Sequence, residues 1–212
     1  MKEIAVVVHG LWLSGGFTVL LRRRLEACGF RTVPFSYPSV RCSAQQNAAL
    51  LQAVVTSLQA PAVHFVGHSL GGLVIRRLFH DFPAQPPGRI VTLGTPHQGS
   101  RAAAAFYRMG IGRALLGGAA RGCLLGGMPR WDGRRALGVI AGTRGIGLGW
   151  LVPGLKGPYD GTVTVEEARL AAAADFIELR VTHFGMLLSA GVQRQVCTFL
   201  AGGRFDHGVA RR

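Results

Sequence analysis

Short apolar runs alternate with longer amphipathic stretches along the chain. The runs at residues 4–8, 31–37, 63–66, 89–93, 136–142 and 175–181 are rich in Val, Ile and Phe, and they are short enough to be strands. Their continuous apolar character is typical of strands that are buried on both faces. Pro34 lacks a backbone donor, which suits an edge strand or the end of a strand for the run at 31–37. The pattern therefore predicts about six strands.

The stretches between these runs have helical spacing. Residues 17–28, 43–59, 73–80 and 185–201 repeat apolar side chains every three to four positions, and Ser43 can cap the second helix. Strands that alternate with helices in this way predict an α/β fold with a mostly parallel sheet that is covered on both faces. We expect one domain over residues 1–201.

Two segments depart from this rhythm. An insertion at about 101–130 contains the glycine-rich stretch 109–128, which has no clean period and is expected to be a mobile loop or a small lid over a site. The last residues, 202–212, are expected to be disordered. No apolar run has the roughly 18 residues of a membrane span, and the first residues do not resemble a secretory signal.

Composition adds two expectations about the environment. The formal net charge of +14 comes almost entirely from scattered arginines, which favours a solvated surface over a nucleic-acid site and leaves transient attraction to an anionic membrane open. The four cysteines, Cys28, Cys42, Cys123 and Cys197, are widely spaced and are expected to be free thiols, which favours the cytoplasm.

The first candidate for chemistry is Ser69, in the stretch "FVGHSLGGLV". Glycine is so common here, with 31 residues in 212, that a G-x-S-x-G pattern arises by chance about once in five such chains. Its position is more informative, because it follows a predicted strand and precedes a helix. A serine on such a turn needs small neighbours two positions away, which Gly67 and Gly71 supply, and it lies where a parallel sheet binds ligands.

The segment "GHSLGG" resembles the nucleophile elbow of the alpha/beta-hydrolase superfamily, in particular its lipase and esterase branch. The "HG" after the first strand and the "GTPHQGS" at residues 94–100 are similar to segments of the same branch. The resemblance implies that the backbone N–H groups of Leu11 and Leu70 form an oxyanion hole. It gives His97 a structural or pocket-edge role.

A serine nucleophile needs a histidine base and an acid that orients it. His183 follows the last predicted strand, and Asp160 in "YDGTV" follows the strand before it, so the order Ser, Asp, His agrees with the family. Asp132 is the rival acid, whereas Glu166 and Glu167 are expected on an exposed helix. His9 and His68 are expected to support the loops, and His64 to be a packed strand residue.

The resemblance implies a serine hydrolase that cleaves carboxylic esters, among them lipid esters. Trp12, Leu13 and His68 are candidates for the substrate pocket, and neither a cofactor nor a metal is expected. An acyltransferase or thioesterase would use the same three residues. A non-catalytic module that binds an anionic partner or membrane is the alternative from another class.

Overall fold

A computed structural model describes residues 2–109, 111–147 and 157–208 of the chain. The six predicted strands are confirmed as β1 (Ile4–Val8), β2 (Arg31–Phe35), β3 (Val63–His68), β4 (Ile90–Leu93), β5 (Leu137–Gly142) and β6 (Asp175–Leu179). They form one sheet in the order β2-β1-β3-β4-β5-β6, and every neighbouring pair is parallel. Pro34 lies in β2 at the edge of the sheet, as its missing donor predicts.

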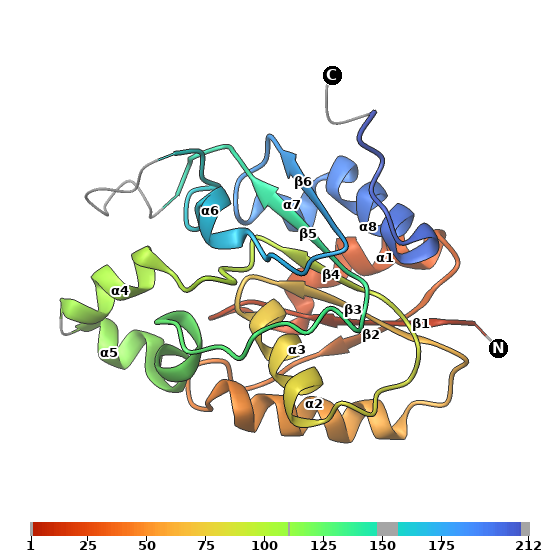
Figure 1. Ribbon diagram of the computed structural model, residues 1–212, viewed down its shortest axis with the longest axis horizontal. Coiled ribbons are helices and arrows are strands. Elements are labelled where there is room, and N and C mark those ends of the chain that lie inside the picture. The colour runs from red at the N-terminus through yellow and green to blue at the C-terminus, as the bar shows by residue number, and fades with distance from the viewer. Residues whose placement is uncertain (1, 110, 148–156, 209–212) are drawn as a thin grey trace.

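Helices cover both faces of this sheet (Figure 1). On one face lie α2 (Ala44–Ser57) and α3 (Leu70–Asp81), and on the other lie α1 (Val19–Ala27) and α8 (Ala190–Gly202). Successive side chains of a strand point to opposite faces, so Ile4, Val6 and Val8 join the core under α2 and α3 while Ala5 and Val7 join the core under α1 and α8. This two-sided burial confirms the predicted α/β architecture of a parallel sheet that is covered on both faces.

The helix ends differ from the predicted ranges. Ser43 caps α2 and forms a capping box with Gln46, as expected. In contrast, α3 begins at Leu70, so the helix starts directly after Ser69. The predicted C-terminal helix is two helices, α7 (Gly185–Leu188) and α8, because Ser189 leaves helical geometry and its side chain caps α8 by accepting from the Val192 N–H.

The insertion is helical, so the expectation of an irregular loop is wrong. It contains α4 (Arg101–Arg108), α5 (Ile111–Leu116), a 3-10 turn (Gly117–Ala119) and a π-helical turn (Ala120–Leu124). Gly117, Gly122 and Gly126 have positive φ angles, so glycine marks the ends and turns of short helices. The figure shows α4 and α5 beyond the ends of the strands toward which the arrows point (Figure 1).

Two further expectations are corrected at the other end of the sheet. Cys28 and Cys197 form a disulfide between the end of α1 and α8, with Cα atoms 6.3 Å apart, and only Cys42 and Cys123 are free. The free-thiol argument for the cytoplasm therefore does not hold for this pair.

The expected disorder of the C-terminal tail is also wrong for residues 203–208. This segment turns back, and Phe205 is buried against Phe199. Residues 209–212 lie outside the described residues. Among the helices of the described chain, none is both long and apolar enough to span a membrane.

Candidate active site

The candidate site lies where the chain direction across the sheet reverses. From β1 the chain moves outward to β2 and then returns to β3 on the other side of β1, so the carboxyl ends of β1 and β3 adjoin at a topological switch point. Parallel sheets bind ligands at such points. Leu11 follows β1 and Ser69 follows β3, so the fold brings these two predicted site residues to the same crevice.

Backbone strain is concentrated at this crevice. Among the non-glycine residues of the described chain, only Trp12 and Ser69 have positive φ angles, 60° and 53°. Such a conformation costs about 1–3 kcal/mol and persists only where the surrounding structure enforces it. At Ser69 the cause is the sharp turn from β3 into α3, which turns the serine toward the crevice.

The glycines around Ser69 allow this turn because no side chain fits there. A Cβ on Gly67 would lie 2.6 Å from the backbone nitrogen of Gly72, and a Cβ on Gly71 would collide with the carbonyl oxygens of Val8 and His9. Gly71 thus lets the start of α3 approach the end of β1 closely. The same approach brings the Leu70 segment toward the Leu11 segment.

Two backbone donors at the crevice lack partners. The N–H groups of Leu11 and Leu70 donate no hydrogen bond to any described residue. Leu70 is the first residue of α3, where the first N–H groups of a helix have no partner within the helix and the dipole favours negative charge. These two N–H groups match the oxyanion positions predicted from the sequence.

The structure joins the predicted base and acid. His183 Nδ1 lies 2.7 Å from Asp160 Oδ2, and both residues are buried. The other carboxylate oxygen of Asp160 accepts from the N–H groups of Thr162 and Val163, at 2.9 and 2.8 Å. The backbone N–H of His183 also donates to the Asp160 carbonyl. Asp160 is therefore rigidly held, and it orients the imidazole so that Nε2 has no partner among the described residues.

An apolar cavity of about 100 Å³ connects these groups. Ser69 and His183 both line it, together with Trp12 from the candidate pocket residues. Its apolar wall comes from the first loop, the insertion and the loops after β4, β5 and β6: Leu11, Pro96, Ala102, Ala103, Phe106, Leu116, Leu124, Val163 and Phe184. Trp12 also donates its indole N–H to the Leu115 carbonyl, which ties the first loop to the insertion. Leu116 and Leu124 lie in the stretch 109–128, which was expected to be a loop or a small lid over a site, whereas Phe106 lies before that stretch and was not predicted.

Two candidate pocket residues lie elsewhere. Leu13 packs against the core under α1 and α8, on the far side of its loop, and it does not line the cavity. His68 is buried behind Ser69 and donates from Nε2 to the His183 carbonyl. Burial, followed by the charge of His183, lowers the pKa of His68 to about 3, so it stays neutral and positions the loop of the predicted base.

The remaining histidines and the rival acid lie apart from the cavity. Arg76 donates to His97 Nδ1, and His97 Nε2 donates to Thr92 Oγ1, so both ring nitrogens are engaged. Burial and the Arg76 charge lower the pKa of His97 well below its usual value. Asp132 is exposed and pairs with Arg134. Buried His64 lies near Glu3 and accepts from the Arg89 N–H, as expected for a packed strand residue.

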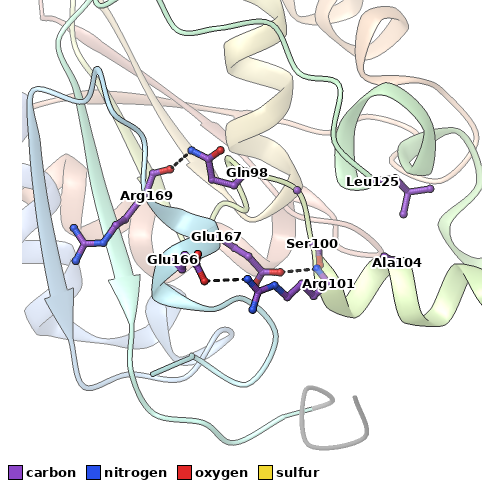
Figure 2. Close-up of a pocket in the computed structure, with 9 residues that line it drawn as sticks. Gln98, Ser100, Arg101, Ala104, Leu125, Glu166, Glu167 and Arg169 are labelled. Carbon is purple, nitrogen blue, oxygen red and sulfur yellow. Dashed lines mark hydrogen bonds and ion pairs between the residues drawn. The ribbon is translucent and has the colours of Figure 1, made fainter. Parts of the chain in front are cut away.

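A second, polar groove of about 490 Å³ lies beside the cavity and shares Ser100 with it. Figure 2 shows the hydrogen bonds between this groove's two sides, where Glu166 and Glu167 of α6 (Val165–Ala168) bond to the side chain and the backbone N–H of Arg101 at the start of α4. Glu167 accepts from the Arg101 backbone N–H and from the backbone N–H and the hydroxyl of Thr164. It is buried, so the prediction that it is exposed is wrong. Glu166 is exposed and pairs with Arg101. The hydrogen bonds and the ion pair across this groove connect the insertion to the segment that carries Asp160.

A parallel six-stranded sheet with a strained serine after its third strand defines the class of α/β-hydrolase folds. The chain belongs to the alpha/beta hydrolase family, whose family model matches residues 5–207. Comparison with curated protein sequences gave no match.

Solved structures share the fold. The mature lipase BlEst2 of Bacillus licheniformis superposes with a TM-score of 0.79 at 22% identity, covering 94% of this chain and 91% of the lipase. A monoacylglycerol lipase of Paleococcus ferrophilus gives 0.63 at 15% identity, covering 94% of each chain. The carboxylesterase CesB of Bacillus subtilis gives 0.62 at 15% identity, covering 95% of this chain and 84% of the esterase.

Proposed function

We propose that the protein hydrolyses carboxylic esters through a covalent acyl-serine intermediate. The observation that carries the proposal is the 2.7 Å bond between His183 and Asp160 at a cavity that also contains the strained Ser69. The lipase and esterase names of the structural neighbours support an ester as the substrate. The proposal assigns the roles of nucleophile, base and acid to Ser69, His183 and Asp160.

The mechanism follows from these positions. Ser69 attacks the ester carbonyl while His183 Nε2 takes its proton, and Asp160 stabilises the imidazolium that forms. The Leu11 and Leu70 N–H groups bind the negative oxygen of the tetrahedral intermediate. His183 then returns the proton to the leaving alcohol. In the second half, His183 takes a proton from water while the water oxygen attacks the acyl carbon. The bond from that carbon to Ser69 Oγ then breaks, the carboxylic acid leaves, and His183 returns the proton to Ser69.

The volume of the cavity limits the size of the acyl group that it can hold. Its volume of about 100 Å³ is smaller than the roughly 150 Å³ at which an engineered apolar cavity binds benzene. Its wall is apolar, with Ala102, Ala103 and Leu124 from the insertion region. We therefore expect short acyl chains to be preferred over long ones when the ester is dissolved in water.

A series of p-nitrophenyl esters of increasing acyl length tests this proposal, with Ser69→Ala as the matched variant. The expected result is hydrolysis that is fastest for the short acyl chains and is lost in Ser69→Ala without a change in melting temperature. Equal rates in the parent and in Ser69→Ala would refute the assignment of the nucleophile.

The same experiment addresses transfer of the acyl group. An acyltransferase would use the same acyl-serine but deliver the group to an alcohol or amine instead of water. The expected product with added acceptor is still the free acid. If ester or amide products dominate when an acceptor is present, the reaction is transfer and the hydrolysis proposal fails.

A further inference from the structure

Exposed apolar side chains gather around the mouth of the cavity. Trp12 and Phe184 line the cavity and are still 51% and 56% exposed, and Leu115 accepts the Trp12 indole N–H and is 46% exposed. Met109 at the end of α4 and Leu188 at the end of α7 are exposed at the same edge of the sheet. Large exposed apolar side chains at one edge of a fold, beside a cavity, are typical of an interaction site.

Charge is distributed unevenly between the two edges of the sheet. At the carboxyl edge, Asp160 and Glu167 are buried and bonded, whereas Glu166 and Glu178 are paired with arginines. Several exposed arginines at this edge form no ion pair with any residue that the structure describes: Arg41, Arg108, Arg113, Arg144 and Arg180.

Acids that are exposed and have no arginine partner at the carboxyl edge lie toward the other edge of the sheet. Glu26 lies in the last turn of α1, Asp132 precedes β5, and Asp206 follows α8. All three lie toward the amino ends of the strands. α4 and α5, which carry Arg108 and Arg113, lie at the left of Figure 1, whereas the start of β1 lies at the right. The face that surrounds the cavity mouth is therefore both cationic and apolar.

We infer that this carboxyl-edge face docks on an anionic lipid surface, with the mouth of the cavity toward the bilayer. Aromatic and aliphatic side chains enter the headgroup region, and the surrounding arginines are attracted to anionic headgroups. Nucleic acid would use the arginines but would leave Met109, Leu115 and Leu188 exposed. A second copy of the chain would bring two cationic faces together. The chemistry of the face thus favours an anionic bilayer.

Vesicle cosedimentation tests the inference directly. The protein is mixed with vesicles of phosphatidylcholine alone or of phosphatidylcholine with phosphatidylglycerol, and the bound fraction is measured at low and high salt. We expect binding to the anionic vesicles that weakens as salt screens the headgroups, and little binding to the neutral ones. Equal binding to both kinds of vesicle would overturn the inference.

Matched charge reversals locate the surface. Arg108→Glu with Arg113→Glu removes two cations from the docking face, and Arg31→Glu with Arg204→Glu removes two from the opposite edge. At about fivefold per arginine, the first pair should weaken binding by at least roughly 25-fold, and the second pair should have little effect. Equal weakening by both pairs would contradict the inference. So would binding of the parent to duplex DNA without binding to vesicles.

The orientation has its own measurement. Brominated phosphatidylcholine in the anionic vesicles should quench the fluorescence of Trp12, and Trp12→Phe should remove the quenched component. Quenching that persists unchanged in Trp12→Phe would show that Trp12 does not enter the bilayer and would overturn this orientation. These measurements need no turnover and can be repeated in Ser69→Ala, so docking and ester hydrolysis can fail separately.

Discussion

The two edges of the central sheet are built in opposite ways. At the amino edge, hydrogen bonds and a disulfide join distant segments: Arg135 donates to the carbonyls of Pro86 and Gly88, Asp175 accepts from Phe205, and Cys28 is bonded to Cys197. At the carboxyl edge, Ser69 is strained, and the N–H groups of Leu11 and Leu70 have no partner among the described residues.

This difference shows how one fold separates stability from chemistry. Satisfied polar groups stabilise the amino edge, because every buried donor that finds a partner avoids a desolvation cost of about 1–3 kcal/mol. Unsatisfied donors and a strained serine at the carboxyl edge are available to a substrate instead. Changes to the reactive groups of the carboxyl edge should therefore alter activity, whereas changes to the bonded groups of either edge should alter stability.

The largest expected effect is on activity. Asp160→Asn keeps the size of the side chain but can hold His183 in the wrong tautomer, so we expect kcat for ester hydrolysis to fall by about 10⁴-fold. Asp132→Asn, the exposed acid before β5, is the matched control and should leave kcat unchanged. Steady-state kinetics on a short p-nitrophenyl ester measures both. Similar losses in the two variants would show that Asp160 has no special role.

The second effect is on stability. The disulfide closes a loop with a sequence separation of 169 residues, so replacing Cys28 and Cys197 by serine should lower the free energy of unfolding by about 2–4 kcal/mol. The kcat/KM of the folded protein should not change, because the disulfide lies away from the cavity. Urea unfolding checks the first expectation, and Cys42→Ser serves as the control. A large loss of kcat/KM at unchanged stability would contradict the division between the edges.

A third change tests the carboxyl edge itself. Glu167→Ala removes the acceptor of the Arg101 N–H and of both Thr164 donors, so we expect a loss of about 1–3 kcal/mol in the free energy of unfolding. Glu166→Ala, one position earlier on the exposed side of α6, should change it by no more than about 0.5 kcal/mol. If thermal and urea unfolding give the same loss for both, the junction in Figure 2 does not stabilise the insertion.

The last effect concerns pH. The pKa values of buried His68 and His97 are lowered, so below the usual value of about 6.5 the unfolded chain binds protons that the folded chain does not. Stability is therefore lost as pH falls below about 6.5, toward about 3 for His68, with a slope of about 1.4 kcal/mol per pH unit for each histidine.

Urea unfolding between pH 7 and pH 5 measures this slope. His97→Gln keeps a hydrogen-bonding amide in place of the ring. It should reduce the slope by about 1.4 kcal/mol per pH unit, which is the contribution of one proton. A variant with the same slope as the parent would show that His97 does not resist protonation in the fold.

Much of the fold could be predicted because its signals are local. The six strands follow from apolar runs such as Ile4–Val8, and the edge position of β2 follows from Pro34. The contact between Asp160 and His183 agrees with the predicted pair, since each residue follows a strand of a parallel sheet and such ends share one edge. Their catalytic roles stay a prediction.

The features that could not be predicted depend on tertiary packing. The disulfide joins cysteines that are far apart in sequence, and spacing gives no measure of their distance in the fold. His68 adjoins Ser69 in sequence, but it lies behind the turn because successive residues at the end of β3 point in opposite directions. The burial of Glu167 depends on the start of α4, which Ser100 caps and where the Arg101 N–H donates to Glu167, and these residues are more than 60 positions away in sequence.

The central claim is that Ser69 is a nucleophile activated by its position. Labelling with a fluorophosphonate, followed by mass spectrometry of the peptides, tests it most directly, because the probe bonds covalently to an activated serine whatever ester the protein prefers. The predicted result is one adduct on Ser69 that is absent from Ser69→Ala and strongly slowed in His183→Ala. An unlabelled parent protein, or an adduct on another serine, would contradict the claim.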